Sequence, residues 1–192
     1  MSEIKAISKK PEKVELASLC YQFIPGLITH DIWMFDMSLP NSPQVECARL
    51  LLEHGRDWGK LKDCRFAQDR RYRFKFGQVK WTEEYIKQHI LGSRYDILRS
   101  IQKRGFDKKL NSKQPVAILK EPFWKTRFGY TADWLNGYEI YHGGRRCAAM
   151  YALGYETVPA LWCKDKKPGS NDMGKFKDKL GEILWTTTPT TP

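Results

Sequence analysis

Apolar residues recur at helical spacing between positions 42 and 55, and this stretch carries clear helix boundaries. Ser42 can cap the first turn, Pro43 suits the first helical position, and Gly55 can end the helix. The apolar stripe consists of Val45, Ala48, Leu51 and Leu52. The pattern predicts a helix that packs one face against a core.

Two further helices are expected between residues 82 and 105. Thr82 can cap a helix that stops near Gly92, and Ser93 can cap another helix that Gly105 ends. The face of this last helix that is expected to be buried consists of Ile97, Leu98 and Ile101.

A strand period occurs instead within residues 65–81. Three aromatic residues alternate with three basic residues, and strict alternation is typical of a β-strand. The alternating residues are Arg71, Tyr72, Arg73, Phe74, Lys75 and Phe76. A strand is therefore predicted in this segment.

Strands and a helix follow one another in the C-terminal half. Strands are predicted at residues 116–120, 138–141 and 157–162, and a glycine turn leads into a helix at 145–153 that Gly154 closes. Pro159 predicts a position at a sheet edge or at the start of its strand, because proline cannot donate to the ladder. Helices and strands together indicate an α+β fold.

The remaining segments are polar or irregular. Residues 1–13 are predicted to be a loose tail, and residues 14–35 are predicted to be extended segments around a turn. Residues 121–137 indicate a loop or hairpin insertion. A polar linker, one short amphipathic helix and a low-complexity, disordered tail are expected in residues 166–192.

Composition narrows the class of protein and its partners. The 192 residues suit one domain, or one domain with an elaboration. Lys and Arg outnumber Asp and Glu by 33 to 22, which gives a net charge of +11. Such a surplus favours polyanionic partners such as nucleotides, nucleic acid or acidic lipid, although a merely basic protein is the alternative.

Cysteine usage and hydropathy bear on location. The five cysteines are widely spaced and form no C-x-x-C motif, so neither a disulfide framework nor a zinc site is indicated. The chain opens on a polar segment instead of a secretory signal, and no apolar run approaches the roughly 20 residues of a membrane span. A cytoplasmic location without membrane partners is expected.

Chemistry concentrates after the strand at 138–141, where a Gly-Gly turn meets two arginines. Glycines allow close approach of the backbone to a ligand, and the free N–H groups at a helix start favour an anion. Guanidinium groups add forked donors that match phosphate oxygens. The predicted phosphate-binding residues are Gly143, Gly144, Arg145 and Arg146. We call these four residues the cradle; the simpler interpretation is a tight turn with two solvated arginines.

The surrounding residues resemble the ParB/sulfiredoxin superfamily. Domains of that family show a strand, a G-E-R-R turn, a helix of small residues, a glycine and a final strand of the type T-[VI]-P-A. The matching motifs here are Tyr138-Glu139-Ile140, Gly143-Gly144-Arg145-Arg146, Ala148-Ala149, Leu153-Gly154 and Thr157-Val158-Pro159-Ala160. Upstream, Gln114-Pro115-Val116 looks like the Q-P-[IV] strand of the family. The resemblance covers about residues 94–165 and implies a small mixed sheet packed by helices.

The chain departs from the family at one position of the motif. Gly144 stands where ParB proteins carry the Glu of G-E-R-R and where sulfiredoxins carry their reactive cysteine, and Cys147 comes three positions later. Sulfiredoxin activity is therefore not expected, and a ParB-like metal arrangement is in doubt. Fewer than 30 residues follow Asp165, so a solitary domain without the ParB helix-turn-helix is expected.

The resemblance also implies a division of the chain and a function. Residues 1–93 are expected to be an N-terminal α/β elaboration, and residues 94–165 the core. The cradle is expected to bind ATP or CTP, with Mg²⁺, or a nucleic-acid phosphate, in a phosphoryl-transfer or hydrolytic enzyme such as an NTPase, kinase or nuclease. Many solitary members of the superfamily are associated with phages and plasmids, so a host cytoplasm is the location expected for a phage-encoded protein.

Candidate catalytic residues flank the cradle. His142 could serve as an acid or base, although a histidine that is hydrogen-bonded at a strand end is an equal alternative. Glu139 is a second candidate, and the sequence leaves open whether it points to the site. The ligands of a metal are not identified; carboxylate candidates are Asp31, Asp36 and Glu84.

The basic aromatic segment, residues 65–80, supports an alternative function. Positive side chains can follow a phosphate backbone, and exposed aromatic rings can stack on bases. The candidate nucleic-acid-binding residues are Arg70, Arg71, Tyr72, Arg73 and Lys75. A non-catalytic DNA- or RNA-binding protein is thus the second hypothesis, and an interaction protein that has lost the ligand is the third.

Overall fold

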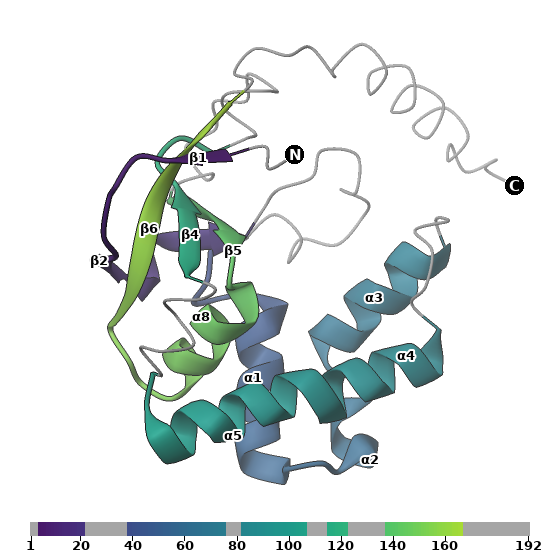
Figure 1. Cartoon of the computed structure of the whole chain (residues 1–192). Helices are drawn as coiled ribbons and strands as arrows, with labels where there is room; N and C mark the ends of the chain where they lie inside the picture. The colour runs from purple at the N-terminus through teal and green to yellow at the C-terminus, as the bar shows by residue number, and fades with distance from the viewer. Residues whose placement is uncertain (1–3, 22–37, 76–81, 107–114, 123–136, 167–192) are drawn as a thin grey trace, which may run out of the picture.

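A computed structural model describes residues 4–21, 38–75, 82–106, 115–122 and 137–166, and shows an α+β architecture with one mixed sheet (Figure 1). Its strands are β1 (Ile4–Ala6), β2 (Glu12–Glu15), β3 (Leu19–Tyr21), β4 (Val116–Leu119), β5 (Tyr138–His142) and β6 (Thr157–Asp165). Within these ranges the strand order is β1-β6-β4-β5-β3, and β2 also pairs with β6. β6 runs parallel to β4, and β3 runs parallel to β5, whereas the other pairings are antiparallel.

The helices lie on one side of the sheet and form the main core with it (Figure 1). They are α1 (Pro43–His54), α2 (Trp58–Leu61), α3 (Arg65–Lys75), α4 (Glu83–Gln88), the π-helical segment η3 (His89–Arg94), α5 (Tyr95–Arg104) and α8 (Gly144–Ala152). α8 contacts both α1 and α5, and its small residues Ala148 and Ala149 are buried at this junction. These small side chains let α8 pack closely between its neighbours.

Alternate residues of β4 point to opposite faces of the sheet, as the strand period requires. Val116 and Ile118 belong to the main core on the helical side. Ala117 and Leu119 contribute to a smaller cluster with Cys163 on the other side. All four residues are buried, so β4 is a central strand that fixes the position of β5 and β6.

The boundaries predicted for α1 are confirmed. The Ser42 hydroxyl accepts a hydrogen bond from the Val45 amide at 3.3 Å, Pro43 begins the helix, and Gly55 ends it with a φ of 61°. The strands predicted at residues 116–120, 138–141 and 157–162 and the helix that ends at Gly154 are also present. These elements could be predicted from local sequence alone, because the capping residues and the apolar periodicity indicated the same helix or strand.

The strand predicted within residues 65–81 is wrong for residues 65–75, which form α3. Phe66 and Ala67 are completely buried, and Arg70, one turn later, stacks over the Phe66 ring at 4.8 Å. This spacing belongs to one face of a helix, and α3 uses it to pack against α1. Residues 76–81 lie outside the described ranges.

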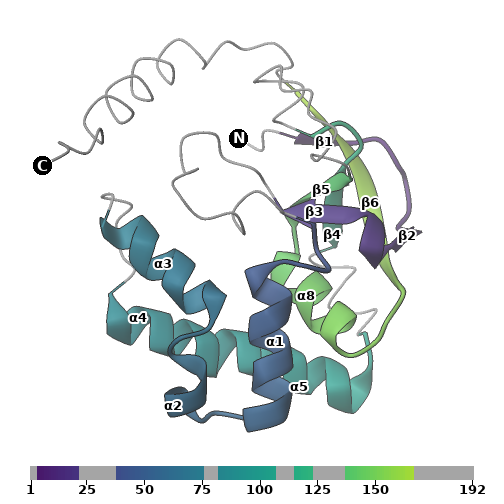
Figure 2. The same cartoon turned by 180° about the vertical axis from the view of Figure 1, so that it is seen from behind.

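The helix break predicted at Gly92 and Ser93 is also wrong. The chain passes from α4 through η3 into α5 without leaving a helical conformation (Figure 2). Ser93 does not cap a helix, because its hydroxyl donates back to the His89 carbonyl at 3.2 Å. The proposed boundary between residues 93 and 94 therefore falls inside a continuous helical run, and the main core contains residues from both sides of it.

The N-terminal segment is part of the sheet and not the loose tail that its polar sequence predicted. Ile4 pairs with Asp165, and Val14 pairs with Val158, on the same edge of β6. β6 is consequently an interior strand, which corrects the edge position suggested by Pro159. The parallel ladder with β4 begins at Ala160, so the proline, near the start of β6, precedes that ladder.

Candidate functional site

A β-bulge at the end of β5 sets the direction of the side chains that enter the site. Ala117 of β4 pairs with His142, but the next residue, Ile118, pairs with Ile140, so Tyr141 is an extra residue in β5. Bulges break the alternation of side chains and are frequent beside active sites. As a result Tyr141 and His142 are both exposed, although they are consecutive residues of one strand.

Gly143 turns the chain from β5 into α8 in a way that only glycine fits well. Its φ is 92° and its ψ is 13°, a left-handed conformation. A Cβ atom at this position would lie 2.8 Å from Cγ2 of Val116 and 3.1 Å from Nη2 of Arg146. The Arg146 guanidinium therefore folds back over the turn at Gly143.

Replacement of Gly143 with alanine is expected to lower the free energy of unfolding by about 1–3 kcal/mol, because strain and overpacking both act there. Gly154 is a matched control, since its φ is 83° and a Cβ would meet nothing within 4 Å. Gly154→Ala should cost about 1 kcal/mol from the backbone alone. Urea denaturation of both variants measures the difference, and equal losses would contradict the close contact with Val116.

Tyr21 of β3 fixes the second glycine of the turn. The Tyr21 hydroxyl donates to the Gly144 carbonyl at 2.6 Å, and a Cβ at Gly144 would lie 2.7 Å from Cε1 of the ring. The ring thus occupies the space that a larger side chain at residue 144 would need. This contact gives a physical reason why residue 144 is a glycine.

The cradle opens into a cavity of about 430 Å³ between α8 and α5. One wall comes from α5 through Asp96, Ile97, Ser100 and Ile101, and continues with Gly105 and Phe106. The opposite wall consists of Tyr141, His142, Gly143, Gly144, Arg145 and Arg146. The volume lies in the range of about 300–1,000 Å³ that is typical of small-molecule sites.

The structure brings together the four predicted cradle residues and His142. Arg145 is exposed and Arg146 is half-buried. Burial lowers the pKa of Arg146, but a guanidinium stays charged at neutral pH. Among the described lining residues the one carboxylate is that of Asp96, whose Oδ1 accepts from Arg56 at 2.7 Å. The cavity is therefore positively charged at its α8 wall.

His142 is held in its neutral form beside these arginines. Burial lowers its pKa below the usual 6.5, and the charges of Arg146 and Arg145 lower it further. A neutral imidazole can accept a proton, so the position suits a general base at neutral pH.

The pKa of His142 is expected to lie below 6.5 in the free protein and to rise when a phosphate ligand binds, because the anion offsets both arginines. An NMR titration of the imidazole C–H signals measures both values. Arg146→Ala should raise the pKa in the free protein. An unchanged pKa in the presence of saturating ligand would show that no anion binds near His142.

Glu139, the other catalytic candidate, does not reach the cavity. Its side chain is completely buried in β5, and it does not line the cavity. It lies instead beside Cys20, to which it is paired in register. Burial, and then the charge of Glu139, raise the pKa of the Cys20 thiol to about 12.

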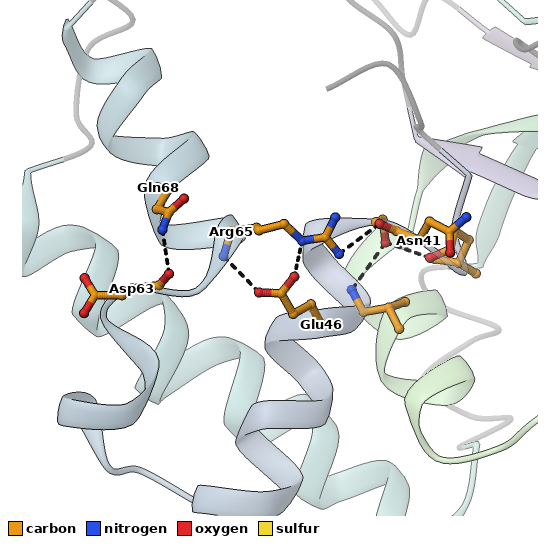
Figure 3. A network of polar contacts seen from close by, with 8 residues as sticks. Asn41, Glu46, Asp63, Arg65 and Gln68 are labelled. Atoms are coloured by element: carbon orange, nitrogen blue, oxygen red, sulfur yellow. Dashed lines mark hydrogen bonds and ion pairs between the residues drawn. The ribbon is translucent and has the colours of Figure 1, made fainter. Parts of the chain in front are cut away.

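The arginines of the basic aromatic segment contact groups of the protein itself. Arg71 binds both carboxylate oxygens of Glu83 at 2.6 and 2.8 Å, and Arg65 binds Glu46 and the Asn41 carbonyl (Figure 3). Arg70 stacks on Phe66 and lies 3.6 Å from the Asp69 carboxylate. The side chains of Tyr72, Arg73 and Lys75 lie outside what the structure describes.

Of the three candidate metal ligands, Glu84 is the one that falls in the described residues, and it does not line the cavity. Glu84 lies on α4, where it accepts from Gln88 at 3.2 Å, and Asp31 and Asp36 lie outside the described residues. In the described ranges no group of three or more His, Cys, Asp or Glu could hold a metal ion. Cys147 is buried in α8, and burial raises the pKa of its thiol to about 12.

Among the described helices, none has the length and apolar character that a membrane span requires.

Three contributors to the site were missed by the sequence analysis. Asp96 and Ser100 are four residues apart on α5, beside the predicted apolar face, and this i, i+4 polar pair was the available signal. Tyr21 gave no signal in the sequence, since it lies 123 residues from the glycine that it contacts.

In searches with the whole chain, no family model, no curated protein and no solved structure matched this sequence.

Proposed function

We propose that this protein is a ParB/sulfiredoxin-like domain that binds the phosphate of a nucleotide in the cavity between α5 and α8. One observation carries the proposal: two arginines and the first turn of α8 open together into a cavity of about 430 Å³. The first backbone bonds of the helix are those from Arg146 and Cys147 to the Gly143 carbonyl. The earlier amides, of Gly144 and Arg145, precede this ladder and are positioned to donate to an anion.

Each cradle residue has a role that follows from its position. Arg146, which folds over Gly143, grips the phosphate, and the more exposed Arg145 supports it. Gly143 and Gly144 let the ligand approach the backbone. The apolar side chains of Ile97, Ile101 and Phe106 on the opposite wall suit the less polar part of a nucleotide.

The reaction class that suits this arrangement is phosphoryl transfer or hydrolysis. Neutral His142 would take the proton of an attacking hydroxyl or water, while the two guanidinium groups stabilise charge on the phosphoryl oxygens. The described lining offers Mg²⁺ one carboxylate, Asp96, which already pairs with Arg56. These residues therefore do not fit a metal site held by protein ligands alone.

A thermal-shift screen with ATP, CTP, GTP and ADP, each with and without Mg²⁺, tests the proposal. A ligand at 100 times its dissociation constant adds about 2.7 kcal/mol of stability. For a chain of this size that corresponds to a rise in Tm of roughly 5–10 °C. A rise with at least one nucleotide, larger than with sodium sulfate at equal ionic strength, is expected. No rise with any of them would contradict the proposal.

The alternative, nucleic-acid binding by residues 65–80, rests on the net charge of +11 and stays a hypothesis. Arg65, Arg70 and Arg71 each have partners within the protein, so contact with a phosphate backbone would require these arginines to exchange partners. The cavity is the favoured site because two arginines and the first turn of α8 open into it together.

A further inference from the structure

Two buried cysteines meet where the start of α3 packs against α1. Cys47 is completely buried in α1, and Cys64, with an exposed fraction of 5%, directly precedes α3. Both belong to the main core, and the Cys47 thiol donates a hydrogen bond to the Cys64 sulfur. The two sulfur atoms are thus in contact, and a disulfide requires their further approach to about 2.05 Å.

The residues beside the two cysteines hold this junction together. These neighbours in the sequence are Glu46 and Arg65. The Arg65 guanidinium binds the Glu46 carboxylate, and the Arg65 amide donates to Oε1 of Glu46 at 3.0 Å (Figure 3). Both contacts join α1 to α3 one residue away from the sulfur atoms, so the closeness of the sulfurs does not depend on their own hydrogen bond. The ion pair also offsets the negative charge of Glu46, which by itself would disfavour a thiolate at Cys64.

The two sulfurs are not equivalent, and Cys64 is the more reactive. Its carbonyl accepts from the Gln68 amide at 3.0 Å, which places Cys64 at the N-cap of α3. The hydrogen bond from Cys47, followed by those from two amides of the first turn, lowers the pKa of the Cys64 thiol against the effect of its burial. Cys47 keeps its proton, because its hydrogen bond to Cys64 and its burial raise its pKa.

The other three cysteines, which we call the reference cysteines, provide a comparison within the same chain. They are Cys20, Cys147 and Cys163. All three are buried, and burial raises the pKa of each of these thiols. A thiol that keeps its proton is a poor nucleophile, so the reference cysteines should react slowly with an oxidant.

We propose that Cys47 and Cys64 form a peroxide-sensitive pair that closes to a disulfide between α1 and α3. The Cys64 thiolate attacks one oxygen of hydrogen peroxide, the O–O bond breaks, and Cys64 becomes a sulfenic acid while the other oxygen leaves as water. The Cys47 sulfur then attacks the Cys64 sulfur, the S–O bond breaks, and the leaving hydroxide takes the Cys47 proton. In total the two thiols lose two electrons and two protons, and the peroxide becomes two molecules of water. Neither cysteine lines the cavity, so the inference is independent of the proposed phosphate site.

Mass spectrometry of the full chain tests the pair. The reduced protein is treated with increasing hydrogen peroxide, then denatured in an alkylating reagent and digested with trypsin, which cleaves between the two cysteines, for example after Arg56. The peptides of Cys47 and Cys64 should become linked and two hydrogens lighter, and dithiothreitol should separate them again. Cys64 should lose its thiol about tenfold faster, or more, than the reference cysteines, because the thiolate is the nucleophile.

Two variants separate the roles of the cysteines. In Cys47→Ser the serine hydroxyl can still donate to Cys64, but it cannot form a disulfide, so Cys64 should stop at a sulfenic acid that dimedone traps. In Cys64→Ser the Cys47 thiol should react as slowly as the reference cysteines.

The digest of the wild-type chain decides the matter even if a variant fails to fold. The proposal is overturned if Cys64 reacts no faster than the reference cysteines. It is also overturned if Cys64 is oxidised to a sulfinic acid without a link to Cys47, or if the disulfides formed join two chains or include a reference cysteine.

Discussion

Replacement of Phe66 with alanine is expected to lower the free energy of unfolding by about 3–5 kcal/mol, the range for loss of a buried aromatic ring. Phe66 is completely buried in α3. Its ring stacks on His89 at 5.9 Å and lies under the guanidinium groups of Arg94 and Arg70. Alanine would leave a cavity between α3 and η3 and would remove the platform for two cations.

Urea denaturation, followed by circular dichroism, measures this loss. Phe66→Leu keeps most of the apolar volume and should cost about 1 kcal/mol, near the limit for volume-conserving changes. A loss below 1 kcal/mol for the alanine variant would contradict the complete burial of the Phe66 ring.

Arg146→Ala is expected to weaken nucleotide binding by about 10- to 150-fold. A charge-assisted hydrogen bond contributes roughly 1.5–3 kcal/mol, and each 1.4 kcal/mol is a factor of ten. Arg146→Lys should recover only part of the loss, because an ammonium retains the charge but not the planar fork. The fold should persist, since the side chain lies at a helix start and only half of it is buried.

Arg99→Ala is the matched control for Arg146→Ala. Arg99 carries the same charge on α5, but it is exposed, donates to Gln102 at 2.6 Å and does not line the cavity. Calorimetry with the nucleotide that gives the largest thermal shift compares the two variants. Equal losses would show that general positive charge, and not the cradle, holds the ligand.

Those parts of the fold with complete local signals could be predicted from the sequence. α1 has a capping serine, a proline at its first position and a glycine stop, and all three act as expected. The turn at Gly143 and the start of α8 were likewise predicted, because glycines and arginines between a strand and a helix of small residues allow few other conformations.

Tertiary packing decided the elements that the sequence analysis missed. The alternation at residues 71–76 favoured a strand, but burial of Phe66 and Ala67 against α1 requires a helix. Gly92 and Ser93 read as a break, yet the chain stays helical because Ser93 bonds back into η3. The polar N-terminal segment joins the sheet through backbone pairing with β6, which side-chain patterns do not reveal.

The candidate site was predicted for one wall only. The cradle and His142 follow one another along the chain, so their proximity could be foreseen. The opposite wall on α5 and the Tyr21 contact depend on segments far apart in the sequence. The direction of Glu139 was left open by the sequence, and in the structure this side chain is buried in β5 and does not line the cavity.

A titration of the ¹⁵N-labelled chain with ADP, followed by two-dimensional NMR, tests the phosphate site most directly. The largest shifts are expected at the amides of Gly143, Gly144, Arg145 and Arg146, which precede or begin the α8 ladder. Smaller shifts should follow at Asp96 and Ser100 on the facing wall. Shifts that spread over exposed lysines and arginines, with these amides unchanged at saturation, would contradict the account.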